Sequence, residues 1–412
     1  MRSDIFHARA EALPKNTSGE IFFDEFGEIC GSADKITIDL AMELGKATAG
    51  AAARIAVGYS DCTICRLLAG AFVSGAAASG AQVTEFGSCF FAAASYLARS
   101  YLFNLMVFFE NDGHRLWVRI TDKFGLPIDE TTRQQIKEIS ETNATHYVGI
   151  SDVIMPKSIL GTLDVFTASM SKRGALSHFK VAVSGISAAS RTLRSVISSC
   201  GGEVTEAKKG ICELSVSDDG MRLFLRDENG RWYDDAHVSA ACVFLHFASG
   251  ESSLAVPPDA PGIVEQIANE YNGRIFRIGR DAVAREIYIS QEILCNAIGD
   301  AAYLLCHIAN NKTTSEKLFS ELPDFTLISR EVGLRGNRKL LLEKLSDACR
   351  DMYSENTGSL RICTDGGWVN IRPSHSASSL RITGEGMNEE IASELCNLFV
   401  EKTSSMDNPP DK

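Results

Sequence analysis

The chain has 412 residues and a formal net charge of -12; 45% of its residues are apolar and 23% are charged. This length exceeds what one hydrophobic core supports and predicts three or four domains, and the composition is that of soluble globular proteins rather than disordered or fibrous ones. The acidic balance argues against a general nucleic-acid-binding protein, but it allows a local basic pocket for a small phosphate.

The N-terminal segment Met1–Ala10 lacks the apolar stretch of a signal peptide, so we expect a cytoplasmic protein. The most apolar region, residues 49–109, is interrupted by charged residues such as Asp61 and Arg99. No segment there has the length and purity of a membrane span, so we expect no membrane association.

Twelve cysteines are scattered along the chain, which suits a reducing compartment. Cys62-Thr-Ile-Cys65 is the one C-x-x-C sequence. A redox or metal role would require a second pair or a thioredoxin-like context, and neither is visible, so we expect two packed thiols.

Strand–helix–strand patterns recur along the first three quarters of the chain. Each combines a short β-branched strand, a Gly or Ser turn and an Ala- or Leu-rich helix, at residues 54–87, 180–205 and 262–277. This repetition predicts three similar α/β units in tandem.

The C-terminal part has a different pattern. Residues 358–363, 368–372 and 380–383 alternate as antiparallel strands, with a turn at Asp365-Gly366, and Asn388–Lys402 is amphipathic like a closing helix. We expect an α+β module here, followed by a disordered tail over Ser404–Lys412. The predicted domain boundaries are 1–152, 153–250, 251–318 and 319–412.

The segment from Asp365 to Ser376, with Ser379–Ile382 after it, resembles the phosphate-binding loop of the α-D-phosphohexomutases, which move phosphate between the C1 and C6 oxygens of hexoses. The family's loop reads roughly D-G-W-V-L-V-R-P-S-G-T-E-P-K-I-R. Arg372-Pro-Ser374 and Arg381 match it, whereas His375-Ser-Ala-Ser378 replaces G-T-E-P. The order of matching segments agrees over nearly the whole chain. The resemblance implies three α/β domains and a C-terminal α+β domain around a central cleft.

The resemblance also assigns a phosphate anchor. Arg372 supplies a charged, planar fork, and Ser374, Ser376 and the loop amides complete an anion nest. His375 adds a pH-dependent donor, and Arg381 follows at the end of the loop. The alternative is that Arg372 and Arg381 pair with nearby carboxylates in a surface sheet.

The family's reactive serine falls on Glu110 when the chain is counted back from Gly125-Leu-Pro-Ile128. A carboxylate accepts phosphate in some phosphotransfer enzymes, but an acyl phosphate does not suit reversible mutase chemistry. Two interpretations remain for Glu110. It is either a solvated glutamate at the end of a strand or a permanent imitation of the phosphoserine charge.

The family's metal loop, D-G-D-G-D-R, corresponds to Ser217-Asp-Asp-Gly-Met-Arg222. Asp219 keeps one ligand position, while Ser217 and Met221 replace the other two carboxylates that Mg²⁺ prefers. This predicts a remnant metal site or a plain polar hairpin turn. Arg222 is a further cleft candidate.

The sugar-gripping motif G-E-x-S-G-H is absent from residues 286–300, where the resemblance places it. Cys30 stands where an arginine is expected near the N-terminus. Arg277 either faces the cleft or lies on a solvated face.

Two functions follow from this resemblance. The first is a pseudoenzyme with no cofactor that binds a phosphosugar, another small phosphate or a protein partner in a regulatory or scaffold role. The second is an active phosphosugar mutase with unusual catalytic residues, which would require Mg²⁺. Phosphoryl transfer depends on positioned groups, and every such group is changed here, so the pseudoenzyme is favoured.

Overall fold

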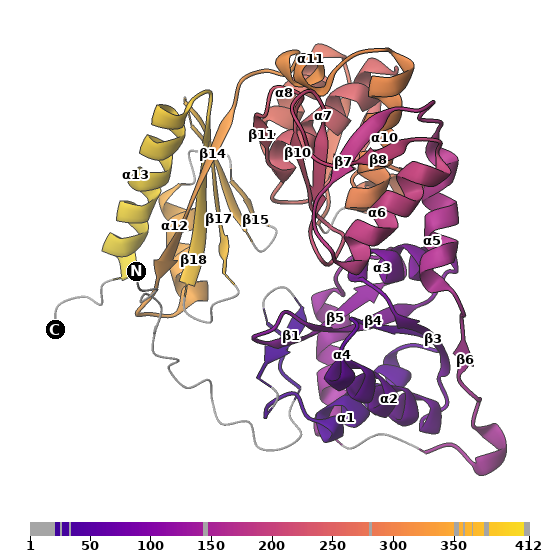
Figure 1. The fold of residues 1–412 in the computed structure, drawn as a ribbon. Coiled ribbons are helices and arrows are strands. Elements are labelled where there is room, and N and C mark those ends of the chain that lie inside the picture. The colour runs from indigo at the N-terminus through magenta and orange to yellow at the C-terminus, as the bar shows by residue number, and fades with distance from the viewer. Residues whose placement is uncertain are drawn as a thin grey trace, which may run out of the picture.

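The structure is a computed structural model that describes residues 21–24, 27–32, 34–142, 147–279, 282–349, 354–356, 359–364, 366–374 and 379–407. The N-terminal sheet with its helices lies at the bottom of Figure 1, the middle of the chain at the upper right, and the C-terminal sheet at the left. The expectations for Met1–Ala10, His375 and Ser376 fall outside the described residues.

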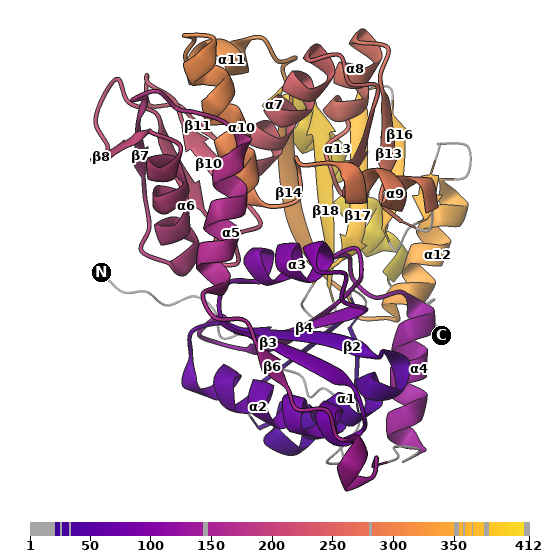
Figure 2. The same ribbon diagram turned by 90° about the vertical axis from the view of Figure 1, so that its right-hand side faces the viewer.

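The N-terminal unit contains a six-stranded sheet in the order β1-β5-β4-β2-β3-β6. Strands β2 and β3 form the predicted parallel pair and are connected by α2. Strand β5 pairs antiparallel with β4. Helices α1, α2 and α4 pack on one face and α3 lies on the other (Figure 2). The bounds are β1 Glu28–Gly31, α1 Ile38–Ala51, β2 Arg54–Tyr59, α2 Thr63–Ala78, β3 Gln82–Ser88, α3 Phe91–Ser100, β4 Leu105–Asn111, β5 Leu116–Asp122, α4 Glu130–Glu141 and β6 Lys157–Ser158.

The second unit has a five-stranded sheet in the order β11-β10-β9-β7-β8. Its parallel strands β7 and β8 flank α6, as the repeat predicts. The hairpin β9–β10 carries the turn that contains Asp219. The bounds are α5 Thr162–Met170, β7 Lys180–Val183, α6 Ala188–Ser199, β8 Glu203–Thr205, β9 Glu213–Val216, β10 Leu223–Arg226, β11 Trp232–Tyr233 and α7 Asp235–Ala248, with short 3₁₀ turns at Ile150–Asp152 and Ser171–Arg173.

The third unit has a smaller sheet than the first two. Within the described residues its sheet is the parallel pair β12 and β13, connected by α8, and the chain then continues through helices. Its core is continuous with that of the second unit, because Leu254 and Ile267 belong to the same buried cluster as Val181 and Leu214. The bounds are β12 Ser253–Val256, α8 Ile263–Glu270, β13 Arg274–Arg277, α9 Ala282–Ser290, α10 Ala297–Asn310 and α11 Ser315–Ser320.

The C-terminal unit is an antiparallel sheet in the order β14-β18-β17-β16-β15, covered on one face by α12 and α13. The predicted strands and the closing helix are confirmed. The helix extends to Asp407, so the prediction of a disordered tail is wrong for residues 404–407; residues 408–412 are outside the described part. The bounds are β14 Thr326–Gly333, α12 Arg338–Ala348, β15 Ser354–Asn356, β16 Leu360–Thr364, β17 Gly367–Pro373, β18 Ser379–Gly386 and α13 Glu389–Asp407.

The mixed α/β class expected from the sequence is therefore observed, with several sheets and helices on their faces. None of the helices in the described ranges is both long enough and apolar enough to span a lipid bilayer.

Candidate functional site

Arg119 joins three carboxylates at the junction of the first and second units. Its guanidinium lies 3.1 Å from Glu110, 3.1 Å from Asp219 and 3.4 Å from Glu28. The ring of Phe91 packs against the same guanidinium at 4.7 Å. We call Glu28, Glu110, Arg119 and Asp219 the Arg119 cluster.

Strand register explains how the first unit supplies its part of this cluster. Arg119 on β5 stands directly opposite Glu28 of β1. On its other side it faces Phe108 of β4, which makes Glu110 its diagonal neighbour two residues further along that strand. Diagonal neighbours in an antiparallel pair are within reach of long side chains, so Arg119 contacts both acids.

Asp219 is fixed by the turn between β9 and β10. The Ser217 hydroxyl donates to its Oδ1 at 2.6 Å and the Met221 backbone N–H donates to the same oxygen at 3.1 Å. The Asp219 carbonyl accepts from the backbone N–H of Ala92, at the start of α3, at 2.9 Å. These contacts hold the loop of the second unit against the first unit, so Asp219 reaches Arg119.

Gly220 is required in the same turn. Its φ is +74°, and a Cβ atom there would meet the Phe90 ring at 2.7 Å. Its carbonyl accepts from the Ala297 backbone N–H at 3.0 Å. The turn is therefore packed between α3 and α10 and has little room to rearrange.

Burial and shared charge shape the protonation of the two central acids. Burial raises the pKa of Glu110 to about 7, with Arg119 opposing the rise and the neighbouring acids, Asp219 and Glu28, adding to it. For Asp219, burial is outweighed by the Ser217 hydrogen bond and the charge of Arg119, which together lower its pKa. The three carboxylates share one guanidinium, which together with Ser217 stabilises the ionised form of Asp219 but does not offset the burial of Glu110.

This environment bears on one of the two interpretations that the sequence left open for Glu110. The Glu110 and Asp219 side chains are only 15% and 16% exposed, so Glu110 is not a solvated strand-end glutamate. Asp218 does lie exposed in a polar turn, as expected. Glu110 and Asp219 are turned away from solvent because both form ion pairs with Arg119, which is distant from Asp219 in sequence.

The loop offers a poor fit for Mg²⁺. Both carboxylate oxygens of Asp219 already accept hydrogen bonds, one of them from Arg119. Its neighbours at the other ligand positions supply a hydroxyl and a thioether where hard oxygen ligands are required. Within the described residues there is no group of three or more His, Cys, Asp or Glu side chains that could hold a metal ion.

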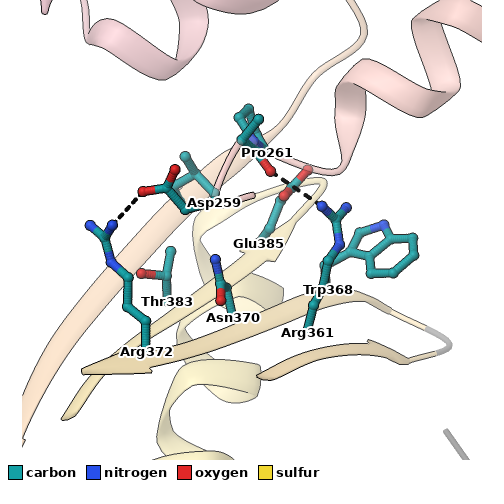
Figure 3. A pocket seen from close by; sticks show the side chains of 10 residues that line it. Asp259, Pro261, Arg361, Trp368, Asn370, Arg372, Thr383 and Glu385 are labelled. Carbon is teal, nitrogen blue, oxygen red and sulfur yellow. Dashed lines mark hydrogen bonds and ion pairs between the residues drawn. The ribbon is translucent and has the colours of Figure 1, made fainter. Parts of the chain in front are cut away.

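A second polar site lies on the open face of the C-terminal sheet. Side chains from β16, β17 and β18 point toward the loop between β12 and α8, as Figure 3 shows, and enclose a cavity of about 60 Å³. Arg372 reaches the carboxylate of Asp259 on that loop. The lining residues are Asp259, Ala260, Pro261, Leu327, Arg361, Trp368, Asn370, Arg372, Thr383 and Glu385.

Period-two alternation builds this face. Trp368, Asn370 and Arg372 on β17 point to the loop, while Val369 and Ile371 point into the core. The cross-strand partners of the three polar-face residues on β18 are also polar: Glu385, Thr383 and Arg381. This alternation buries Val369 and Ile371 against the helices and leaves mainly polar side chains on the opposite face, where the loop before α8 lies.

The loop is attached to the sheet by Glu385 and Arg361. The Glu385 carboxylate accepts from the backbone N–H groups of Gly262 and Ile263, at 2.5 and 2.8 Å, and so caps the start of α8. Arg361 donates to the Ala260 carbonyl at 3.3 Å and to Glu265 at 3.4 Å, and it stacks on Trp368 at 4.1 Å.

Arg277 is buried against this loop and binds its carbonyl groups, so it faces neither a cleft nor solvent. Its side chain is 7% exposed, and it donates to Glu265 at 2.8 Å and to the Ala260 carbonyl at 2.8 Å. The solvated face expected for it is wrong because the carbonyls of the Pro-rich loop converge on one guanidinium.

The remaining predicted anchor residues have the following places. The Ser374 hydroxyl donates to Glu331 at 2.6 Å, and Arg381 is exposed on the strand opposite Arg372. Arg222 is also exposed, and its backbone holds it in the Asp219 turn: its N–H donates to the Ser217 hydroxyl at 2.9 Å, and its carbonyl accepts from the Ser217 N–H at 3.0 Å. Arg372 does pair with a carboxylate, which was one of the two alternatives.

Sequence reasoning missed Arg119, Arg361 and Glu385. The signal for Arg119 was a basic residue inside an alternating strand, Leu116–Asp122, that directly follows the strand bearing Glu110. Nothing local indicates its contact with Asp219, which lies 100 residues away.

Comparisons with known proteins agree with this fold. No family model matches the chain. Residue identity is 24% over 214 residues with "Probable phosphoglucosamine mutase" of Methanopyrus kandleri, covering 46% of this chain and 47% of that protein. It is 23% over 202 residues with phosphoglucosamine mutase of Methanococcus maripaludis, covering 43% and 45%. The matches thus span about half the length of these curated relatives.

Solved structures match over nearly the whole chain. A phosphoglucomutase/phosphomannomutase family protein from Burkholderia thailandensis superposes with a TM-score of 0.74 at 14% identity, covering 95% of this chain and 99% of that one. Parafusin, a phosphoglucomutase from Paramecium, gives 0.65 at 11% identity, covering 95% and 97%. The chain has the fold of the α-D-phosphohexomutases, which confirms the resemblance drawn from its sequence.

Proposed function

We propose that this chain is a phosphohexomutase-like protein without mutase turnover, which binds a phosphosugar or a protein partner in a regulatory or scaffold role. The observation that carries this proposal is the guanidinium of Arg119 between Glu110 and Asp219. By the resemblance, these are the positions of the reactive serine and of a metal ligand. Glu110 offers no nucleophilic hydroxyl at its position, and Arg119 already pairs with the Asp219 carboxylate that Mg²⁺ would need.

Electrostatic reasoning supports the same proposal. Phosphoryl transfer depends almost wholly on positioned charge, and a divalent ion neutralises the transferring group. The Arg119 cluster has one cation and three acids, so it presents no excess positive charge to a phosphate. It fits a structural junction between two units better than a phosphoryl-transfer centre. We therefore propose that no Mg²⁺ is used.

The cavity on the C-terminal sheet supports the phosphosugar as a ligand. Arg361 and Arg372 both reach it, and its volume holds a few water molecules or a group of similar size. Asp259 already pairs with Arg372, so an anion must displace this carboxylate. We expect weak binding for that reason, and a partner that also moves the Asp259 loop would bind more tightly.

The second candidate is an active phosphosugar mutase with unusual catalytic residues and a requirement for Mg²⁺. It is favoured by the sequence similarity to phosphoglucosamine mutases over 46% of the chain. It would require Arg119 to leave Asp219 when metal and substrate bind.

Phosphorus NMR of the full chain with glucose, mannose and glucosamine 1-phosphates, Mg²⁺ and a little hexose 1,6-bisphosphate separates these candidates. Line broadening without conversion is the expected result. New 6-phosphate signals that grow with protein concentration would overturn the first proposal in favour of the mutase. Unchanged spectra would mean that none of these sugar phosphates binds, and a protein partner would then be the proposed ligand. Arg372→Gln tests whether any broadening depends on the C-terminal cavity.

We also propose that the chain forms four domains around a central cleft, in keeping with the matched fold. A cytoplasmic location and a lack of nucleic-acid partners are proposed on two grounds. All twelve cysteines are free thiols, and the net charge is -12.

A further inference from the structure

Cys62 and Cys65 lie where strand β2 passes into helix α2, apart from the C-terminal cavity. Cys62 is the N-cap of α2, and its Sγ accepts a hydrogen bond from the Cys65 backbone N–H at 3.4 Å. The positive end of a helix of 16 residues therefore faces the Cys62 sulfur.

A second observation concerns Ser60, in the loop before the helix. Its hydroxyl lies 4.0 Å from Cys62 Sγ and donates to Cys65 Sγ at 3.5 Å. Both sulfurs thus converge on one oxygen atom. Cys62 is half-buried and accessible from solvent, whereas Cys65 is fully buried. One thiol can be attacked from outside, and the other can act only on its neighbour.

The exposed charges beside the pair oppose each other, because Asp61 directly precedes Cys62 and Arg66 directly follows Cys65. Burial raises the pKa of Cys65, and the charge of Glu110 also acts on Cys65 and adds to this rise.

The chain offers an internal comparison in Cys200 and Cys306, which influence each other electrostatically but come from separate helical segments and are 7% and 6% exposed. Neither of these two sulfurs caps the start of a helix.

In place of the two packed thiols expected from the sequence, we propose that Cys62 and Cys65 form a redox-active dithiol that low-molecular-weight disulfides oxidise to an intramolecular disulfide. The Cys62 thiolate attacks one sulfur of the small disulfide, forming a mixed disulfide and releasing one small thiol. The Cys65 thiol, whose pKa is raised to about 12 by burial, then loses its proton and attacks Cys62 Sγ, which releases the second small thiol and makes this the slower step. The two protein thiols are oxidised and the small disulfide is reduced to two thiols.

The dithiol adjoins the strand that carries Glu110. The Ser60 backbone N–H donates to the Phe109 carbonyl at 2.9 Å, and the Asn111 backbone N–H donates to the Ser60 hydroxyl at 3.2 Å. Oxidation draws the two sulfurs together and changes their contacts with Ser60. We therefore expect faster amide exchange at Asn111 in the oxidised protein.

The experiment uses the full chain in buffers of reduced and oxidised glutathione, followed by acid quenching, alkylation and mass spectrometry. Trypsin cleaves after Arg54 and Arg66, so both cysteines fall in one peptide, residues 55–66. The expected result is a peptide lighter by two hydrogen atoms, oxidised about tenfold more readily than Cys200 and Cys306.

Two variants assign the roles of the sulfurs. Cys65→Ala should trap glutathione on Cys62, and Cys62→Ser should leave Cys65 unmodified. The proposal is overturned if peptide 55–66 stays reduced while other cysteines oxidise, or if Cys62→Ser reacts as fast as the unaltered chain. Should Cys65→Ala fail to fold, the rate of the unaltered chain against Cys62→Ser decides.

Discussion

Arg119 carries one positive charge among three acids, and burial together with this imbalance determines the stability of the Arg119 cluster and the pKa of Glu110. Its side chain is 21% exposed, so the charges interact through a medium of lower dielectric than water. Removing one partner from a buried charge network leaves the others uncompensated, which costs more than the network itself contributes.

Replacing Arg119 by methionine should therefore lower the free energy of unfolding by about 3 kcal/mol at neutral pH. Glu28, Glu110 and Asp219 would then face one another without a counter-charge. Urea unfolding measures the loss, with Arg66→Met, at an exposed arginine, as the matched control. A loss no larger than in the control would mean that the Arg119 cluster contributes nothing to stability.

Glu110 gives a prediction about pH. Its pKa is raised from 4.5 in the unfolded chain to about 7 in the folded protein, mainly by burial. Between these values the folded state keeps a proton that the unfolded state has released, so stability falls as the pH rises through this window. Asp219 has the opposite sign, because its pKa is lowered: its contribution is lost as the pH falls below its ordinary value of 3.8.

The unaltered protein should accordingly lose stability relative to Glu110→Gln between pH 4.5 and pH 7. The loss should be no more than about 3 kcal/mol, since one pKa unit corresponds to about 1.4 kcal/mol. Unfolding free energies at several pH values test this, with the exposed Glu401→Gln as the control. A difference that stays constant, or grows in favour of the unaltered protein, would show that Glu110 is ionised throughout.

At the scale of elements, the loop from Pro257 to Gly262 depends on close contact with strand β17. Gly262 has an ordinary φ of -70°, so its backbone does not require glycine. A Cβ atom there would nevertheless meet the Trp368 ring at 2.2 Å. Glycine is needed at this position because of its small size.

Gly262→Ala should destabilise the protein by about 1 to 3 kcal/mol, the usual cost of inserting a methyl group into a packed contact. Trp368→Ala in the same chain should recover most of that loss, because it removes the obstructing ring. Thermal unfolding of the two single variants and the double variant gives the coupling. Additive effects would argue that the loop and β17 are not in contact.

Local patterns account for the elements but not for the site. The segments 54–58 and 80–87 alternate or run apolar over strand lengths, and they form the parallel pair β2 and β3 as predicted. The strands β16 and β17 likewise pair antiparallel, as predicted, whereas Asp365 of the predicted turn lies outside the described residues. These elements are determined by residues close together in the chain, so the pattern of a single sequence is enough to predict them.

The contacts of Arg119 with Asp219 and of Glu385 with Gly262 join residues 100 and 123 apart in sequence. No periodicity encodes such a pairing, because it results from how whole units pack. The family resemblance singled out Glu110 and Asp219, but Arg119, which contacts both, has no counterpart in the motifs compared. The core that the third unit shares with the second is likewise not displayed by a pattern local to residues 262–277.

At the scale of the molecule, the C-terminal sheet is attached to the third unit through Glu385, Arg361 and Arg372. Glu385 is largely buried, and burial raises its pKa even though two backbone N–H groups stabilise its charge. It acts as the helix cap of α8 while belonging to a different sheet. The attachment thus serves two units at once.

Glu385→Ala should cost about 1 to 2 kcal/mol, as the loss of a helix cap does, and should loosen the C-terminal sheet. Hydrogen exchange at Gly262 and Ile263 should accelerate, and small-angle scattering should show a larger radius of gyration. Glu389→Ala, at an exposed position in α13, is the control. Unchanged exchange at these two amides would contradict the attachment.

The central claim is that an internal guanidinium replaces the metal between Glu110 and Asp219. Mn²⁺ binding to the full chain, followed by electron paramagnetic resonance, tests it most directly, because Mn²⁺ prefers the same oxygen ligands as Mg²⁺. We predict no stoichiometric Mn²⁺ site in the unaltered protein, with or without a hexose phosphate. Binding of one Mn²⁺ per chain that Asp219→Asn abolishes would contradict the claim and support an active mutase.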